Sequence, residues 1–345
     1  MGDIWQQILE NFLISDKNRS EYTEDAQGIV NYVMEELKSV DSQFAKAFDG
    51  LSLGGSYLDR VKLRTPDEFD LHMKLKFPFP IYPRAYSNGF MYLYAPIGRN
   101  SCNIVSWDGY IHTAALQDWL RGAFRKIFKS NLSLKCPSGR SYEVSYTLAG
   151  YACAHSLKAT CGSRVIEFDL VPAFSFSRSE WPSFNLPVPN NMAPPWSWYA
   201  VPQTKKHLND DRTYLAISPM WEREMMKDKQ NLKNVLRLMK ALRDAHKPDL
   251  PHLSSYMLKT VILHRMDNIS WDSNLGSLFI EMWSRLVENL RNRRLPYYLA
   301  NGHNVFDRMN DQELSKCLAT ATDLLYKLRN YQNNPGQLRK LFDLN

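Results

Sequence analysis

The feature that most constrains this chain is a glycine-rich turn followed, after eleven intervening residues, by two acids in an alternating pattern. Gly54, Gly55 and Ser56 form the turn, and Glu68 and Asp70 alternate with apolar residues. Alternate side chains of a strand share a face, so we expect the two acids on one face and their apolar neighbours in the core. Because adjacent carboxylates repel each other, we expect a divalent cation between them.

Composition sets the broad class of the protein. Hydrophobic residues make up 44% and aromatic residues 12% of the 345 residues, which is typical of a folded globular protein. The net charge of +7 favours a polyanionic partner. The five cysteines form no C-x-x-C pair, so we expect no structural zinc site. The start of the chain has no signal-peptide pattern and no apolar run approaches 20 residues, so we expect a soluble, cytoplasmic protein without membrane contact.

Periodicity predicts an α+β protein in two lobes. A long helix is expected to begin at Thr23, which has helix N-cap chemistry, and to end near Asp49. Further elements are predicted as strands at 67–76, 89–94, 141–148 and 164–174, and as helices at 114–129, 231–246, 255–266, 275–290 and 312–331. Residues 181–202, rich in Pro, Trp and Asn, are expected to lack regular structure. We place the domains at 1–203 and 204–345, a mixed, bent sheet with an N-terminal spine helix followed by a helical lobe.

The turn and the acids together fit the signature of a nucleotidyltransferase. Backbone N–H groups and the Ser56 hydroxyl would cradle triphosphate oxygens, and paired carboxylates would bind two divalent cations. Such a site needs a third carboxylate from a neighbouring strand. Asp169 is the candidate, and Glu167, which shares its face, is the alternative. Each piece alone has a simpler explanation, as an ordinary loop or the solvated face of an edge strand, but their order and spacing favour the site.

These residues resemble those of cyclic GMP–AMP synthase (cGAS) and the cGAS-like receptors. The similarity begins with Gly55-Ser56-Tyr57, Val61-Lys62 and Pro66-Asp67-Glu68-Phe69-Asp70, and continues in the segments 199–202, 236–240 and 253–260. The resemblance implies a bilobed nucleotidyltransferase that joins ATP and GTP into a cyclic dinucleotide second messenger in innate antiviral immunity. It also implies that Glu68, Asp70 and Asp169 hold two Mg²⁺ or Mn²⁺ ions.

The resemblance assigns further residues to the substrates. Gly55 and Ser56 would hold the triphosphate, Lys240 and Ser255 would reach phosphates, and Tyr256 would stack on a base. Glu222 would match a substrate-contacting acid. From the residues alone, Ser254 and Ser255 could instead cap a helix, and Lys240 could lie on a solvated face.

The chain departs from cGAS in two places. Between residues 205 and 255 there is no His/Cys cluster, so we expect no zinc and none of the zinc-bearing thumb by which cGAS grips double-stranded DNA. Where cGAS has Trp-Arg-Leu-Ser-Phe this chain has the segment 214–218, so a substrate-binding arginine is missing near Leu215. Base choice and linkage therefore do not carry over.

Basic side chains suggest what activates the protein. Three groups of them are apparent, namely Lys229, Lys233, Arg237, Lys240 and Lys247; Arg291, Arg293 and Arg294; and Arg121, Arg125, Lys126 and Lys129. Duplex RNA is read through shape, phosphates and 2′-hydroxyls, which a basic face without a thumb can contact. We therefore expect double-stranded RNA as the activator in preference to double-stranded DNA, with activator-induced ordering of residues 54–60 and possible homodimerisation.

Two other functions fit the same residues. One is a template-independent nucleotidyltransferase that extends RNA or makes linear oligonucleotides. The other is a catalytically silent binding protein on the same fold, although three convergent acids argue against it, since stability alone does not require them.

Overall fold

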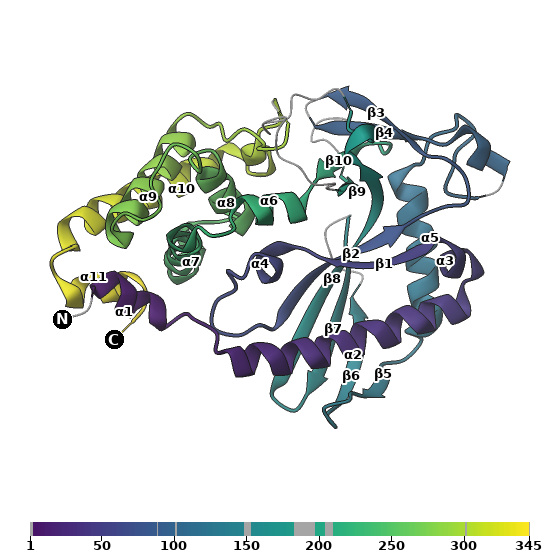
Figure 1. The fold of residues 1–345 in the computed structure, drawn as a ribbon, viewed down its shortest axis with the longest axis horizontal. Helices are drawn as coiled ribbons and strands as arrows, with labels where there is room; N and C mark the ends of the chain where they lie inside the picture. The colour runs from purple at the N-terminus through teal and green to yellow at the C-terminus, as the bar shows by residue number, and fades with distance from the viewer. Residues whose placement is uncertain are drawn as a thin grey trace. The chain divides into compact units, whose positions relative to one another are not determined.

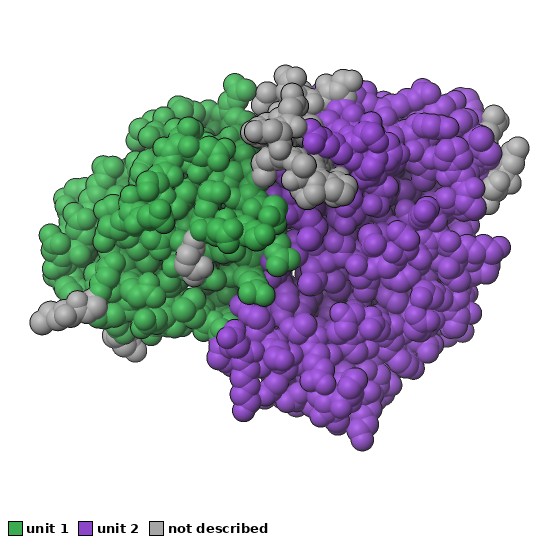
Figure 2. Space-filling model, in the orientation of Figure 1, with its two compact units in different colours: residues 1–14, 59–64, 222–345 green, residues 15–58, 65–221 purple. Residues whose placement is uncertain are grey.

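Two compact units divide the chain in the computed structural model (Figures 1 and 2). Residues 1–14, 59–64 and 222–345 form the first, called the helical unit, and residues 15–58 and 65–221 form the second, called the sheet unit. The structure describes residues 3–87, 89–100, 102–147, 153–182, 197–203, 210–300 and 302–344. The predicted boundary between residues 203 and 204 adjoins residues outside this description and stays a prediction.

A mixed sheet forms the centre of the sheet unit. Its strands are β1 (Phe48–Leu53), β2 (Glu68–Leu75), β3 (Tyr82–Ser87), β4 (Phe90–Tyr94), β5 (Leu132–Lys135), β6 (Ser141–Thr147), β7 (His155–Cys161), β8 (Arg164–Ser177), β9 (Ser197–Pro202) and β10 (Tyr214–Ile217). The main order is β3-β4-β10-β9-β8-β7-β6-β5, and β2 joins β1 to β8. The β2–β8 pair is parallel, whereas the other strand pairs described are antiparallel.

Short helices and one long helix accompany this sheet. They are α2 (Asp16–Val40), α3 (Ser42–Ala47), α4 (Gly55–Leu58), α5 (Thr113–Ile127) and α6 (Pro219–Met225), the last of which continues into the helical unit, with 3₁₀ turns at Pro96–Asn100 and Arg178–Glu180. The apolar face of α5 is buried, including Leu116, Leu120 and Phe124, as the predicted stripe requires.

The predicted start of the long helix was wrong. Ser15 caps α2 by accepting a hydrogen bond from the Asn18 N–H at 3.3 Å, eight residues before Thr23. Thr23 instead lies inside the helix, where its hydroxyl donates to the Arg19 carbonyl at 2.6 Å. The helix also ends earlier, because Asp41 leaves the helical conformation and caps α3. Caps are local hydrogen bonds, and several polar residues in this stretch have the chemistry to form one.

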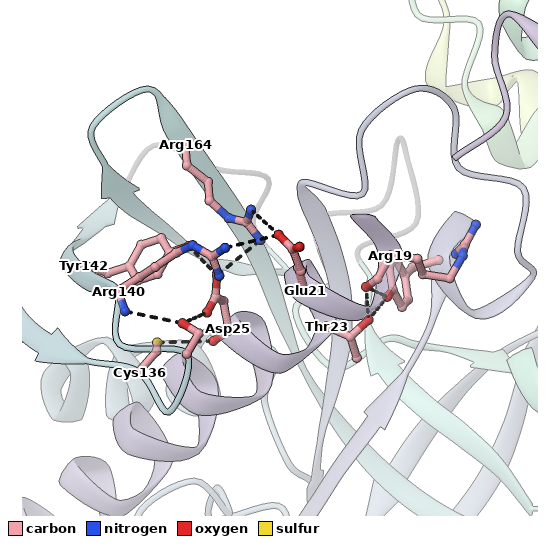
Figure 3. Close-up of polar contacts among 10 residues, drawn as sticks. Arg19, Glu21, Thr23, Asp25, Cys136, Arg140, Tyr142 and Arg164 are labelled. Atoms are coloured by element: carbon pink, nitrogen blue, oxygen red, sulfur yellow. Dashed lines mark hydrogen bonds and ion pairs between the residues drawn. The ribbon is translucent and has the colours of Figure 1, made fainter. Parts of the chain in front are cut away.

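A buried carboxylate anchors α2 to the sheet (Figure 3). Asp25 is fully buried, and its carboxylate accepts hydrogen bonds from Tyr142 at 2.7 Å and from Arg140 at 3.1 Å. Arg164 adds an ion pair at 3.2 Å. An ionised carboxylate is tolerated in the interior only when it is paired and hydrogen-bonded. These contacts therefore fix the first half of α2 against the ends of β6 and β8.

The helical unit is built from α1 (Ile4–Glu10), α7 (Gln230–Ala245), α8 (Ser255–Leu263), α9 (Leu275–Arg291), α10 (Asp311–Tyr331) and α11 (Pro335–Leu341), with 3₁₀ turns at Lys247–Asp249 and Val305–Arg308. Trp5 of α1 packs against Phe279 at a centroid distance of 5.1 Å and against Phe342 at 6.4 Å. Its indole occupies the space above Gly276, where an added Cβ would lie 2.1 Å from Nε1. The N-terminal helix is thus part of the core of this unit.

The α+β class predicted from periodicity agrees with these elements. The helices predicted at 231–246, 275–290 and 312–331 correspond to α7, α9 and α10 within two residues at each end. The expectation that 181–202 lacks regular structure was wrong for 197–202, because β9 pairs with β8 and β10 there; residues 183–196 lie outside the described residues. No helix within the described ranges is long and apolar enough to cross a membrane.

Acid should destabilise the sheet unit through His155. This residue is 1% exposed, and its ring stacks on Phe124 at 4.8 Å. Burial, helped by the positive charge of Arg121, lowers the pKa of His155 from its ordinary 6.5 to about 3. Between these two values the unfolded chain takes up a proton that the folded one does not, so stability falls with falling pH, by up to about 1.4 kcal/mol per pH unit.

The measurement is the free energy of unfolding as a function of pH. His155→Phe keeps an aromatic ring on Phe124 and removes the titrating group, so its stability should fall less steeply than that of the wild type between pH 6.5 and pH 4. Equal slopes for the two proteins would contradict a neutral, buried His155.

Candidate active site

Strand register brings the three predicted acids together. In the parallel β2–β8 pair, Glu68 lies opposite Glu167, and Asp70 lies opposite Asp169. The carboxylates of Glu68, Asp70 and Asp169 offer oxygen atoms that all lie within 4.8 Å of one another. Glu68 is exposed and the two aspartates are half-buried, so the cluster is open to solvent. Glu167, the alternative third acid, is not part of this cluster.

The opposite face of the same strands is apolar. Phe69 and Phe168, which sit next to the acids in sequence, are 3% and 1% exposed, and their rings stack at 5.7 Å. Tyr57 of α4 packs on Phe69 at 4.5 Å, and its hydroxyl is hydrogen-bonded to Thr23 of α2. These residues line a cavity of about 390 Å³ between α2 and the sheet. The acids are therefore held in place by aromatic packing behind them.

Ser156 fixes one of the acids and was missed by the sequence reasoning. Its hydroxyl on β7 donates a hydrogen bond to Asp169 Oδ1 at 2.6 Å, and the two residues are paired in the antiparallel register. The sequence offered a weak signal, because a serine between the buried residues His155 and Leu157 belongs to the opposite, polar face of a strand.

The glycine turn is built around Asp70. The Gly54 N–H donates to the Asp70 carbonyl at 2.8 Å, and Gly55 has a φ of +56°, in the left-handed region that favours glycine. A Cβ added to Gly55 would lie 1.7 Å from Asp70 Oδ2. Residues Gly55–Leu58 form one turn of helix, α4, where the sequence had suggested a flexible turn.

His72 is a second residue that the sequence reasoning missed. It follows Asp70 by two positions and therefore shares the face of the acids. Its ring stacks on Tyr199 at 5.4 Å and closes against Gly54, where an added Cβ would lie 2.6 Å from Cε1. Burial lowers the pKa of His72 to about 4, although a hydrogen bond with the Ser52 backbone opposes this shift. His72 is therefore neutral near pH 7 and adds no charge beside the acids.

The other predicted substrate residues lie in the helical unit, engaged with protein groups. Lys240 Nζ donates to the Val61 carbonyl at 2.9 Å, and Ser255 Oγ accepts from Arg243 at 3.1 Å. The Tyr256 hydroxyl donates to Glu222 Oε1 at 3.1 Å. Burial raises the pKa of Tyr256 well above its usual value, and the charge of Glu222 adds to this shift. Their substrate roles stay predictions.

The neighbouring Ser254 settles one alternative for this segment. It is the N-cap of α8, and its side chain accepts a hydrogen bond from the Met257 N–H at 3.2 Å. Ser255 is the first residue of the helix and does not serve as its cap, and its hydroxyl accepts the hydrogen bond from Arg243 instead.

The donor set of the cluster fits a hard divalent cation. Three carboxylates, one exposed and two half-buried, supply the oxygen ligands that Mg²⁺ and Mn²⁺ prefer. The space beside Asp70 is kept clear because Gly55 has no side chain. Glu68, Asp70 and Asp169 would be the residues that hold such an ion.

Comparison with known families agrees with this geometry. The family described as "Mab-21 protein nucleotidyltransferase domain" matches residues 57–206, and the "Mab-21 protein HhH/H2TH-like domain" matches residues 231–323. A cyclic GMP-AMP synthase-like protein of Drosophila melanogaster is 57% identical over 325 residues, covering 94% of this chain and 92% of the relative. The chain belongs to the cGAS-like nucleotidyltransferase family, as its motifs predicted.

More distant relatives cover the chain to a similar extent. A cyclic GMP-AMP synthase-like receptor of Drosophila eugracilis is 36% identical over 90% of this chain and 85% of its own length. Another, from Lucilia cuprina, is 27% identical over 96% of this chain and 94% of its own length. The predicted α+β nucleotidyltransferase fold with a C-terminal helical lobe is confirmed by the two domain matches.

Replacing Gly55 with alanine should disrupt the acid cluster. The new Cβ would displace the Asp70 carboxylate, in addition to the roughly 1–2 kcal/mol cost of a left-handed non-glycine residue. Gly162 provides a matched control, because it has a φ of +58° and no atom within 4 Å of an added Cβ.

Both variants are compared with the wild type by denaturant unfolding and by Mn²⁺ binding. Gly162→Ala should lose stability from backbone strain alone and bind Mn²⁺ normally, whereas Gly55→Ala should lose more stability and bind Mn²⁺ at least tenfold more weakly. Equal behaviour of the two variants would contradict the close approach of Gly55 to Asp70.

Proposed function

We propose that this protein is a cyclic dinucleotide synthase that joins ATP and GTP when it is activated by double-stranded RNA. The observation that carries the proposal is the cluster of Glu68, Asp70 and Asp169 beside a glycine turn in a member of the cGAS-like family. The names of the relatives, cyclic GMP-AMP synthase-like protein and receptor, support the product class.

Each residue of the sheet-unit site has a defined task in this proposal. Bound divalent cations would supply Lewis-acid activation of the attacking hydroxyl and neutralise the leaving pyrophosphate. Ser156 keeps the Asp169 carboxylate oriented through its 2.6 Å hydrogen bond. Gly55 leaves room beside Asp70, and the Ser56 hydroxyl with the backbone of the turn binds triphosphate oxygens.

The helical unit contributes the remaining substrate contacts in the proposal. Lys240 and Ser255 bind phosphate oxygens, Tyr256 stacks on a base, and Glu222 contacts a nucleotide. Substrate binding would release the Tyr256 hydroxyl from Glu222 and would add phosphate oxygens to the contacts of Lys240, whose ammonium has donors besides the one used by the Val61 carbonyl. Residue Leu215, in place of the arginine of cGAS, lies buried in β10, so base selection must come from other side chains.

A cluster of positive charge supports an RNA partner. The pKa of Lys233 is lowered by burial and further by the charges of Arg237, Arg223 and Arg60, and the charge of Asp59 opposes this shift only in part. The four basic residues, called the basic cluster, lie in the helical unit, and such concentrated charge favours phosphate contacts. In the other two predicted basic groups, Arg121, Lys126 and Arg293 form ion pairs with aspartates. We infer that the basic cluster, and not the total charge, binds the RNA. We further propose that the enzyme acts in the cytoplasm and that it dimerises when RNA activates it.

Loss of either aspartate should abolish synthesis. Asp70→Asn and Asp169→Asn keep the side-chain shape but remove a charged oxygen ligand, so we expect roughly a thousandfold slower product formation. Glu167→Gln is the matched control, since Glu167 lies on the same strand and outside the cluster. The assay incubates ATP, GTP, Mn²⁺ and duplex RNA with the protein and resolves phosphatase-resistant products.

The control also settles which acid completes the site. Full activity of Asp169→Asn with loss in Glu167→Gln would assign the third position to Glu167. Products that phosphatase removes would favour the linear-oligonucleotide alternative over cyclisation, and absence of triphosphate binding would favour a silent binding protein.

Reversal of charge in the basic cluster should weaken RNA binding. Arg223→Glu with Lys233→Glu removes two cations and adds two anions, so we expect at least tenfold weaker binding of duplex RNA. Lys327→Glu with Arg329→Glu on α10 changes the net charge equally and is the control. Fluorescence anisotropy with labelled duplex RNA and duplex DNA of equal length measures both variants. Equal losses in the two variants would show that only total charge matters, and product formation with DNA alone would contradict an RNA activator.

A further inference from the structure

A buried ionic cluster in the helical unit holds the segment that follows the glycine turn. Lys259 Nζ of α8 lies 2.6 Å from Asp59 Oδ2 and 2.7 Å from Glu222 Oε2. The three residues are 7%, 3% and 4% exposed. Asp59 directly follows α4, the helical turn that begins with Gly55 and Ser56. The cation thus joins the chain after the turn to α8 and α6.

The cluster favours the ionised form of its lysine. Burial by itself would lower the pKa of Lys259, but the charges of Glu222 and Asp59 outweigh burial and raise it above its usual value. The Tyr256 hydroxyl donates to the other oxygen of Glu222 at 3.1 Å. Glu222 therefore has two partners, whereas Asp59 Oδ1 has none within the described part of the chain. Lys259 is consequently the contact through which Asp59 is held.

Two more cations hold the residues that come next. Arg237 donates to the Arg60 carbonyl at 2.7 Å, and Lys240 donates to the Val61 carbonyl at 2.9 Å. Arg60 has a φ of +59°, an unfavourable conformation for a residue with a side chain. Such a conformation persists where surrounding contacts over-determine it. Each residue from 59 to 61 is therefore tied to α7 or α8 by a separate positive charge.

We propose that Lys259 is a positioning residue for the nucleotide-binding turn. By clamping Asp59 against Glu222 it fixes residues 59–61, and this limits the conformations open to Gly55–Leu58 when a triphosphate binds. In this role it acts through the chain that it holds. The inference rests on the proposed function of the turn, but the clamp itself is a property of the ligand-free protein.

Asp59→Asn is the variant that tests the clamp. It is isosteric and leaves Lys259 paired with Glu222, so it avoids burying an unpaired charge. Lys259→Met would instead leave two carboxylates facing each other without a cation and is the harsher change. Glu222→Gln removes the same charge from the same cluster but keeps the Asp59–Lys259 pair, which makes it the matched control for the conformation of the segment.

The first readout is hydrogen exchange in the ligand-free protein. Amides of residues 55–61 should exchange at least tenfold faster in Asp59→Asn than in the wild type, while those of α9 and α10 are unchanged. In Glu222→Gln the exchange of residues 55–61 should stay within about twofold of the wild type. Equal exchange of this segment in Asp59→Asn and wild type would overturn the proposal.

The second readout separates positioning from general stability. Asp59→Asn should raise the KM for ATP at least fivefold and change kcat by less. Asp210→Asn is the control, because it breaks another hydrogen-bonded ion pair, that of Asp210 with Arg212, in the sheet unit and should leave the KM unchanged. If the wild type binds triphosphate and Asp59→Asn binds it equally tightly, the proposal falls alone. If the wild type binds no triphosphate, the proposed function is wrong. The role of Lys259 in nucleotide binding is then also wrong, whatever the exchange data show.

Discussion

In-register parallel pairing of β2 with β8 forces like charges together, and the rest of the site depends on it. The pairing sets Asp70 beside Asp169 and Glu68 beside Glu167 on one face of the sheet, where the glutamates are exposed and the aspartates half-buried. Carboxylates at such spacing repel each other, so the arrangement lowers the stability of the sheet unless packing offsets the repulsion. Phe69 and Phe168 supply that packing from the other face of the same strands, since alternation sends every second side chain there. A bound cation would relieve this repulsion, and the stability of the sheet would then be coupled to the chemistry of the site.

The structure holds these acids from three directions. Ser156 orients Asp169 from β7, the Gly54 N–H holds the Asp70 backbone, and the missing side chain of Gly55 leaves space for the Asp70 carboxylate. Helix α2 closes the apolar side, where the hydroxyl of Tyr57 bonds to Thr23. Two residues further along α2, the Asp25 carboxylate accepts a hydrogen bond from Tyr142 of β6. The glycine turn is thus in contact with α2 on one side, and the chain that continues from it is tied to α7 and α8.

The extent to which the site could be predicted follows from the range of the interactions involved. Glu68 and Asp70 were recognisable because strand alternation is a local property, and Asp169 because its strand carries the same pattern. Ser156 and His72 were missed because their roles depend on register and on a contact with Gly54, and neither is encoded by spacing along the chain. The start of α2 was misplaced because several polar residues could have formed the cap. Strands β1 and β10 were not expected, since six and four residues give little periodicity and, unlike β4, neither is rich in aromatic residues.

Neither unit of this protein is one continuous piece of chain. In the helical unit, Trp5 from the N-terminal helix fills the space over Gly276. Asp59, from a separate part of the chain, forms an ion pair with Lys259. A fusion protein that contained only the residues after 221 would therefore have a cavity in the core of its helical half. Its buried cation, Lys259, would also lack one of its two anions. We therefore expect that neither half can be exchanged by itself between family members. Recombination should keep the two halves together, and the sequence should evolve by substitutions within the intact chain.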